Sequence, residues 1–264
     1  MILFGTAILA LPISSAAQKS ISLIDALFTS TSAICVTGLI VLDTSKDFSI
    51  FGQAVVILLI QIGGLGYMTS ATILSIVVGK KVGLKERLVL QEALNVLSLE
   101  GLIRFTKGVL KVTLLFEFIG AVILSMRFSL DMDIGRAIYF GIFHSVSAFN
   151  NAGFSLFSDN LIEYKSDVVV NIIITTLIIM GGIGFLVISD IYKYIRKEVL
   201  RISTHTKMVI LVTSILITSG TVLILLFEYF NPKTFSEFSM KTKLLTAYFQ
   251  SVTARTAGFN TLDI

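Results

Sequence analysis

Long apolar runs dominate the pattern of this chain and predict helices that cross a membrane. A spanning helix needs about 20 mainly apolar residues. Four runs meet this length, and only one of them contains charges (Lys111 and Glu117); they are 48–79, 109–126, 168–189 and 208–227. The first run is too long for one straight crossing and must tilt, bend or project. The apolar start of the chain, 1–12, is too short to cross alone.

Three further apolar stretches lie between these runs and are richer in Ser, Thr, Asn and Gly: 22–42, 137–158 and 244–259. Each predicts a short helix followed by an irregular end that contains a glycine. Irregular backbone is tolerated at membrane depth only where it is buried in protein or lines a wet cavity. Because the motif occurs three times, we favour re-entrant pore loops; the alternative is full spans with small-residue packing faces.

The glycines Gly38, Gly153 and Gly258 stand in matching settings. Their segments read SAICVTGL (32–39), SAFNNAGF (147–154) and TARTAGF (253–259), and an acid follows each, at Asp43, Asp159 and Asp263. A repeated motif indicates units that function only together. This repeat predicts backbone carbonyls that converge on a central ion path.

Other features repeat in step and divide the chain into units of span, pore loop and span. IGGLGYM (62–68) matches MGGIGFL (180–186), and LLFE occurs at 114–117 and 225–228. The predicted organisation is a first repeat at 1–79 with a clipped first span, a cytoplasmic loop at 80–103, a second repeat at 104–193, a second cytoplasmic loop at 194–205, and an incomplete third repeat at 206–264.

The loop charges predict the orientation. Residues 79–111 hold seven basic residues against three glutamates, and 190–207 hold five against two acids. The segments that flank the first two glycine motifs are acidic. Because cytoplasmic loops carry an excess of Lys and Arg, we expect both basic loops in the cytoplasm and the pore loops facing outside, in a multi-pass protein of the plasma (inner) membrane.

The composition excludes several classes of protein. The chain is 55% hydrophobic and 14% charged, whereas a soluble domain has about 25% charged residues. The net charge of +4 and its confinement to loops argue against nucleic-acid binding. With one cysteine, Cys35, and two histidines, we expect no internal disulfide and no CxxC or histidine metal site. No nucleophile–base pair or Walker motif is present, so we expect no enzyme and no cofactor.

Taken together, these motifs resemble the Trk/Ktr/HKT superfamily of potassium transporters, especially the bacterial Ktr and Trk membrane subunits. The resemblance is carried by AICVTGL (33–39), NNAGF (150–154), ARTAGF (254–259), both GGxG motifs, and LKER (84–87) with QEALN (91–95). It covers nearly the whole chain. It implies an all-α membrane fold with four repeats around a pore, so this chain is expected to be a truncated member with three repeats at least partly present. The fourth filter segment and the gating loop of the third repeat have no counterpart here.

The predicted ion ligands are backbone carbonyls, because rings of carbonyls replace the water around a potassium ion without placing fixed charge in the membrane. Glycine suits such a turn because it adopts φ values that other residues resist. The expected ligands are Val36, Thr37 and Gly38; Asn151, Ala152 and Gly153; and Thr256, Ala257 and Gly258. Each segment has one glycine in its core, whereas K⁺-channel filters have a longer glycine-containing motif. By resemblance, this shorter filter implies weaker selectivity for potassium over sodium.

Four polar side chains are predicted to support the filter from behind. Asn150 and its neighbour Asn151 brace it from behind, and Arg255 points behind it and bonds acids or carbonyls. Glu117 lies inside a span, where a carboxylate is costly and marks function by default. We favour a conformational anchor bonded to backbone or a pore helix; the alternative is a direct role in the ion path.

The predicted function is potassium uptake through the pore, passive or assisted by sodium. Two alternatives remain: a proton-coupled secondary carrier, with broken spans at a midplane site, and a non-conducting assembly subunit, because the fourth repeat is absent. The transported ion is K⁺, with Na⁺ as a second candidate. The expected partners are the lipid bilayer and, by resemblance alone, a second copy in a homodimer and a cytoplasmic ring of nucleotide-binding subunits of the KtrA/TrkA type.

Overall fold

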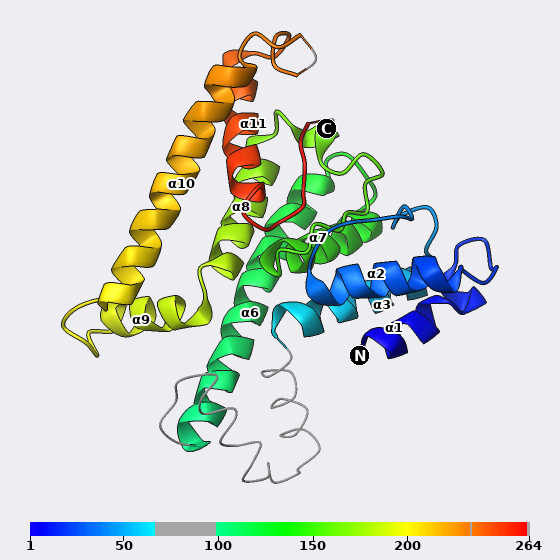
Figure 1. Cartoon of the computed structure of the whole chain (residues 1–264), viewed down its shortest axis with the longest axis horizontal. Helices are drawn as coiled ribbons and strands as arrows, with labels where there is room; N and C mark the ends of the chain where they lie inside the picture. Colours follow the sequence, from blue (N-terminus) through cyan, green and yellow to red (C-terminus); the bar gives the residue numbers. More distant parts are fainter. Residues whose placement is uncertain (67–98, 233, 263–264) are drawn as a thin grey trace.

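The structure, a computed structural model, describes residues 1–66, 99–232 and 234–262. Within these ranges the regular structure is helical, as predicted, apart from one isolated bridge between Ser15 and Phe48. The elements in chain order (Figure 1) are α1 (Ile2–Leu9), η1 (Pro12–Ser14), α2 (Leu23–Cys35), α3 (Ile50–Gly64), α6 (Leu99–Phe128), α7 (Ile134–Phe149), η2 (Ile162–Tyr164), α8 (Val168–Gly182), α9 (Phe185–Ile195), α10 (Thr204–Glu228) and α11 (Met240–Thr253).

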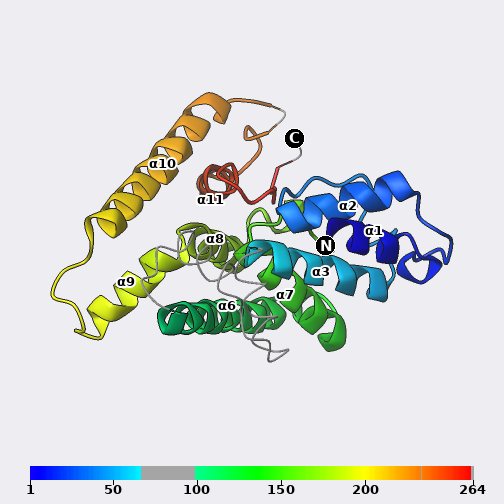
Figure 2. The ribbon, with the colours of Figure 1, turned by 60° about the horizontal axis from the view of Figure 1, so that its bottom comes forward.

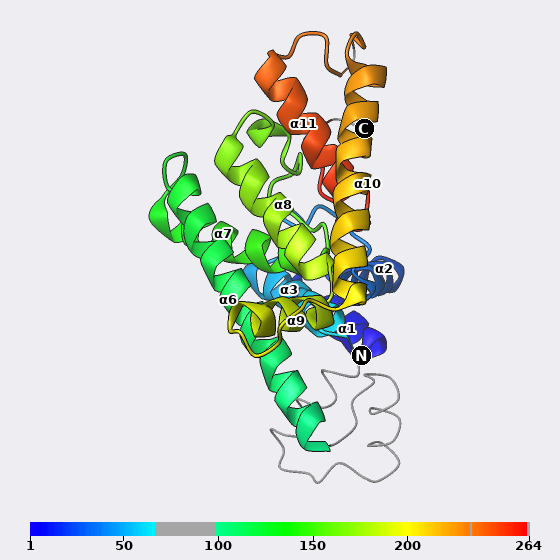
Figure 3. The same cartoon turned by 90° about the vertical axis from the view of Figure 1, so that its left-hand side faces the viewer.

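Two of the described helices are long and apolar enough to cross a bilayer. They are Thr106–Phe128 within α6 and Thr204–Glu228, which is α10. They match the predicted spans 109–126 and 208–227. A third candidate consists of α8 and α9 together, and Figure 3 shows α8 between α6 and α10 in that view. The helices α2 and α3 are apolar but shorter.

The helices pack in three successive groups. In the first, α2 packs against α1 and α3; in the second, α7 packs against α6 and α8; in the third, α11 packs against α10. The groups touch in order, since α3 contacts α7 and α8 contacts α11. Figure 2 shows the first group on one side of the molecule and α9 and α10 on the other. Each short helix that precedes a glycine segment therefore packs against a longer helix or a broken span of its own group.

The predicted span 168–189 is broken near its end, because α8 ends at Gly182 and α9 leaves at an angle of 98°. Gly184 lies between them with a φ of +89°, a conformation that favours glycine. A Cβ on Gly181 would lie 1.7 Å from the carbonyl oxygen of Phe149, at the end of α7. Glycine thus permits both the bend and the close approach of two backbones.

The first GGxG motif is used in the same way at the end of α3. A Cβ on Gly63 would lie 2.1 Å from the carbonyl oxygen of Ile34, near the end of α2. Gly66 has a φ of +78°. In both groups, a glycine in the last turn of the partner helix lets that helix pass directly over a carbonyl near the end of the short helix. The predicted run 48–79 is described only as far as residue 66.

The predicted loop boundaries can be compared with the helices where the structure describes them. Most of the first loop, including the motifs at 84–95, lies outside the described residues, but α6 already begins at Leu99. The second loop is shorter than predicted, because α9 continues to Ile195 and α10 begins at Thr204.

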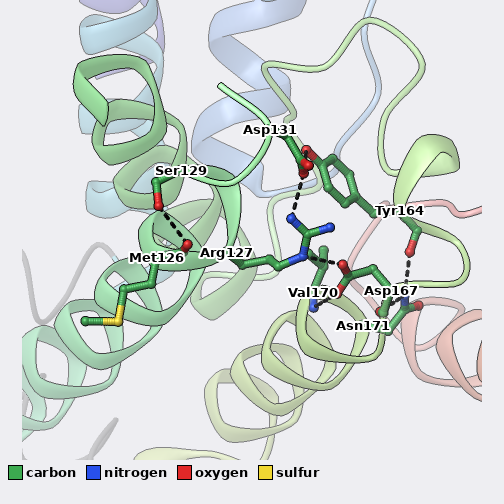
Figure 4. A network of polar contacts seen from close by, with 8 residues as sticks. All are labelled: Met126, Arg127, Ser129, Asp131, Tyr164, Asp167, Val170 and Asn171. Atoms are coloured by element: carbon green, nitrogen blue, oxygen red, sulfur yellow. Dashed lines mark hydrogen bonds and ion pairs between the residues drawn. The ribbon is translucent and has the colours of Figure 1, made fainter. Parts of the chain in front are cut away.

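A polar cluster ties the end of α6 to the start of α8 (Figure 4). The Nε atom of Arg127 bonds the carboxylate of Asp167, and its Nη1 atom lies 2.7 Å from Oδ2 of Asp131. The Tyr164 hydroxyl donates to Asp131 over 3.3 Å. Asp167 also caps α8 by accepting from the backbone N–H of Val170 at 2.9 Å. One arginine therefore joins two helix ends and the turn η2.

Candidate functional site

The three glycines of the repeated motif meet in the middle of the molecule. The position of a Cβ on Gly38 would lie 3.3 Å from the Cα atoms of both Gly153 and Gly258. A Cβ on Gly153 would lie 2.8 Å from the Cα of Gly258. Segments more than 100 residues apart in the sequence are thus in direct backbone contact. The helices α2, α7 and α11 lead into these segments; Figure 1 shows α11 above α2 and α7 in that view.

Carbonyl groups gather at the same place. The Ala152 oxygen lies 2.9 Å from the Cβ position of Gly38, the Ala257 oxygen 2.6 Å from that of Gly153, and the Thr37 oxygen 3.6 Å from that of Gly258. Each of these carbonyls belongs to the residue before its own glycine and faces the glycine of another segment. Three of the nine predicted ligands, one from each segment, are therefore brought together.

The backbone conformation at the three glycines is the same. Their φ values are +75° at Gly38, +72° at Gly153 and +70° at Gly258. In this region a side chain is strained, and a Cβ would also collide with the neighbouring segment at the first two positions. The conformation thus favours glycine at all three positions, and the close approach of backbones is a second reason for glycine at Gly38 and Gly153.

Each glycine also follows the C-terminal end of a short helix. The helices α2, α7 and α11 end at Cys35, Phe149 and Thr253, a few residues before the glycines. The C-terminal end of a helix carries partial negative charge and favours a cation. Three such ends near one point make the region favourable for a positive ion without a carboxylate.

Among the described residues, no group of three or more His, Cys, Asp or Glu side chains is arranged to hold a metal ion. The oxygen atoms that gather at the glycines belong to peptide groups. Backbone oxygens suit an ion that must enter and leave, so the arrangement can act on a passing cation rather than retain a resident one.

The two asparagines lie behind the second segment, on the side of the spanning helices. Asn150 Nδ2 donates to Oε1 of Glu117 at 3.0 Å and to Oε1 of Gln61 at 3.2 Å. With its amide oriented so that both ends have partners, Asn151 donates to the carbonyl of Ile178 at 3.0 Å and accepts from the Thr256 hydroxyl at 3.2 Å. These contacts join the second segment to α3, α6, α8 and the third segment.

Glu117 is buried within α6, with 6% of its surface exposed. Its carboxylate accepts from Asn150, the residue that caps α7, and its main-chain carbonyl accepts from Ser145 Oγ at 2.7 Å. A buried carboxylate needs such partners. The contacts are those of an anchor between a spanning helix and the short helix.

Arg255 does not make the bond that we expected. Its guanidinium has no hydrogen bond or ion pair with any residue in the described ranges, and the residue is partly exposed. Asp263, the acid that follows the third motif, lies outside those ranges. The role of Arg255 behind the filter remains a prediction.

His144 joins α7 to the chain that follows Gly153. Its Nδ1 lies 2.8 Å from the Phe140 carbonyl, and its Nε2 lies 3.0 Å from Ser155 Oγ. The backbone N–H of Leu156 donates to the same Nε2 at 3.4 Å, which fixes the proton on Nδ1. His144 is therefore a bonded residue of the short helix α7.

Sequence reasoning missed three hydroxyl residues that bond the glycine segments directly. Ser32, Ser147 and Thr253 each donate to the main-chain carbonyl of the residue after the glycine. In the first two segments the serine stands six residues before the glycine, which is a signal visible in the sequence. In the third segment the spacing is five, so the pattern is lost by direct alignment.

The comparisons with known proteins agree on one family of cation transport proteins. Residues 5–264 match the family model described as TrkH, cation transport protein. The chain is 46% identical over 262 residues to the Ktr system potassium uptake protein B of Bacillus subtilis, covering 99% of this chain. It is 40% identical over its full length both to the Vibrio alginolyticus protein of the same name and to the potassium/sodium uptake protein NtpJ of Enterococcus hirae. It spans 58% of the length of each of these relatives.

A solved structure supports the fold. The potassium transporter TrkH from Vibrio parahaemolyticus superposes with a TM-score of 0.63 over 98% of this chain and 50% of that one, at 22% identity. The resemblance inferred from the motifs is therefore confirmed, and so is the all-α fold of a membrane transporter. The family and these relatives are named for ion transport, in agreement with the expectation that the chain is not an enzyme.

Proposed function

Because the chain belongs to the TrkH family of cation transport proteins, we propose that it forms part of a potassium uptake pathway whose filter includes the segments around Gly38, Gly153 and Gly258. The observation that carries the proposal is the meeting of these glycines, with one carbonyl from each segment at their junction. The names of the relatives supply the ion.

The proposed ligands are the carbonyls at the glycine and at the two residues before it in each segment. In this proposal the three groups of helices are three repeats around the ion path, and Asn150, Asn151, Arg255 and Glu117 hold the filter from behind. The homodimer and the nucleotide-binding ring, which the resemblance implies, also remain predictions, as do the cytoplasmic side of the basic loops and the plasma membrane location.

A carrier driven by protons is less well supported. In the structure, the buried carboxylate of Glu117 is bonded to Asn150 rather than placed at the glycines. The names of two relatives mention potassium alone, and that of the third mentions potassium and sodium. The fluxes of both ions therefore need to be measured.

The test is ion flux into liposomes that contain the protein at its natural length. We expect K⁺ to enter down its gradient and faster than Na⁺. The variant Gly38→Ser should lower the K⁺/Na⁺ ratio, because serine is strained at a φ of +75° and its Cβ would lie 2.9 Å from the Ala152 carbonyl oxygen. The control is Gly108→Ser in α6, where a Cβ would meet no atom within 4 Å. An unchanged ratio in Gly38→Ser would reject the filter assignment.

A further inference from the structure

Ser32 contacts the first glycine segment on both sides of Gly38. Its main-chain carbonyl accepts from the backbone N–H of Thr37, the residue before the glycine, at 3.0 Å. Its hydroxyl donates to the carbonyl of Leu39, the residue after the glycine, at 2.7 Å. One helical residue thus brackets the glycine, so that neither peptide next to it can turn without breaking a bond.

The second segment has the same bracket. The carbonyl of Ser147 accepts from the N–H of Ala152 at 2.8 Å, and its hydroxyl donates to the Phe154 carbonyl at 2.7 Å. Ser147 is completely buried, so its hydroxyl has no water to bond in place of this carbonyl. A buried polar group without a partner is costly, which makes the contact persistent.

The third segment keeps the bracket with a different residue type and a shorter loop. Thr253 accepts from the N–H of Ala257 at 2.9 Å and donates to the Phe259 carbonyl at 2.6 Å. The first two loops contain one more residue, and each has a non-glycine residue at positive φ, Val36 and Asn151. The third, which is fully described, has none. The contact is therefore preserved although the local backbone is not.

Ordinary capping of a helix end explains only half of this arrangement. The bond from the N–H to the helical carbonyl satisfies an orphan acceptor of the last turn. It does not explain why a side chain reaches past the glycine to the following carbonyl in all three segments. That second bond acts on the glycine segment and not on the helix.

We propose that Ser32, Ser147 and Thr253 are positioning residues that set the cation preference of the pore. This inference rests on the proposed function. Each hydroxyl engages the carbonyl after the glycine and holds the preceding carbonyls at a fixed separation. Selectivity between potassium and sodium depends on the separation, number and mobility of coordinating carbonyls. Without the hydroxyl, the segment gains freedom to close around the smaller ion.

The experiment compares two fully buried serines of the short helices. Ser147→Ala removes the bracket. Ser30→Ala in α2 is the control, because Ser30 is also fully buried and also donates to a main-chain carbonyl, at 2.9 Å, but that carbonyl belongs to Ile2 in α1. Initial K⁺ and Na⁺ fluxes are measured in liposomes with the natural-length protein. We expect the K⁺/Na⁺ ratio to fall at least ~3-fold in Ser147→Ala, as for loss of one hydrogen bond, and to stay unchanged in Ser30→Ala.

A second pair tests the same contact while keeping the side-chain volume. Thr253→Val removes the hydroxyl with little change of shape and should lower the ratio, whereas Thr253→Ser keeps the hydroxyl and should preserve it. Unchanged ratios in both Ser147→Ala and Thr253→Val would overturn the inference and leave the proposed function intact. Failure of both of these variants to fold, with Thr253→Ser folding normally, would overturn it in favour of a purely structural role. If the unmodified protein carries no K⁺, the proposed function fails, and the inference fails with it.

Discussion

At the scale of single residues, the carboxylate of Glu117 costs free energy because it is buried in α6. A carboxylate inside a membrane is tolerated only when polar partners compensate for the water that it has lost. Here the partner is Asn150, at the point where α7 gives way to the second glycine segment. In the proposed function, the carboxylate therefore holds the second glycine segment in place, and the bond that its oxygen accepts matters more than its charge.

This view predicts different results for two substitutions of Glu117. Glu117→Gln keeps an oxygen that can accept from Asn150, so the flux should show the same pH dependence as in the unmodified protein. Glu117→Ala leaves the Asn150 amide short of a partner and should lower the free energy of unfolding by about 1–3 kcal/mol. Flux from pH 5.5 to 8.5 and thermal unfolding in detergent measure the two effects. A flattened pH profile in Glu117→Gln would support proton coupling instead.

Asp43, in the loop after the first glycine segment, predicts a pH dependence of stability. Burial alone would raise the pKa of this carboxyl, but hydrogen bonds from Ser45, Ser158 and the backbone of Ser45 and Lys46 outweigh it and hold the pKa below its ordinary value of 3.8. A group with a lowered folded-state pKa contributes stability above its unfolded pKa and loses it as pH falls through the folded one. The contribution is thus complete at neutral pH and fades below about pH 4.

The test of this prediction is the difference in melting temperature between the unmodified protein and Asp43→Asn. We expect the difference to be constant from pH 6 to 8 and to shrink as the pH falls below 4. Asp133→Asn is the comparison for a loop carboxylate at a helix N-terminus, where Asp133 Oδ2 accepts from the N–H of Gly135. A difference for Asp43→Asn that grows toward acid pH would contradict the assignment.

At the scale of helices, glycines decide how closely the broken span approaches the short helix before it. Gly181→Ala would place a Cβ 1.7 Å from the Phe149 carbonyl oxygen. Because that atom belongs to the backbone, α7 and α8 must separate, at a cost of about 1–3 kcal/mol or more. Gly108→Ala in α6 meets no atom within 4 Å and should be neutral or stabilising by up to about 1 kcal/mol. Melting temperature and yield of monodisperse protein measure both, and equal behaviour of the two variants would refute the packing argument.

The Arg127 cluster makes a second prediction at this scale (Figure 4). The carboxylate of Asp167 is 15% exposed and that of Asp131 is 43% exposed. Asp167→Asn should therefore lower the free energy of unfolding by about 1.5–3 kcal/mol, since a charged hydrogen bond and a helix cap are weakened. Asp131→Asn should cost below about 1 kcal/mol, because water screens the pair. Reversal of this order in thermal unfolding would show that burial does not decide the strength of the cluster.

The helices and their glycine ends could be predicted because both follow from local composition. A run of apolar residues fixes α6 and α10, and the Ser-, Thr- and Gly-rich stretches fix α2, α7 and α11 with their irregular ends. The size of the turn after α8, 98°, could not be predicted, because an apolar run such as 168–189 has the same composition whether it continues or bends.

The sequence predicted part of the candidate site, namely its three glycines, but not the hydroxyl contacts around them. The glycines were visible because they recur in matching motifs, and their φ values near +70° favour glycine. The role of Thr253 could not be predicted, because Thr253 stands five residues before its glycine, whereas Ser32 and Ser147 stand six residues before theirs. The contacts of Arg255 could not be predicted either: its guanidinium makes no ion pair within the described ranges, and an ion pair depends on where a distant chain segment lies.

At the scale of the whole molecule, charge is separated between the two ends of the α8–α9 unit. Four exposed basic residues follow or end α9, at Lys193, Arg196, Lys197 and Arg201, while the opposite end holds Asp131, Asp159, Glu163 and Asp167. Basic loops are retained on the cytoplasmic side during insertion. The bend does not change this argument, because α9 and the loop after it stay at the end of α8 that is remote from Asp167 (Figure 1).

Cysteine labelling in intact cells tests this orientation, and the chain is well suited to it. Cys35 is the single cysteine of these 264 residues, so Cys35→Ser, with any cysteine outside them also replaced, provides a background without thiols. In that background, a membrane-impermeant maleimide should label Ser166→Cys, an exposed position just before α8, from outside. Glu198→Cys, exposed within the basic loop, should react only after the membrane is permeabilised. The reverse pattern would place the glycine segments on a path entered from the cytoplasm, and labelling of both positions from outside would mean that α8 does not cross the membrane.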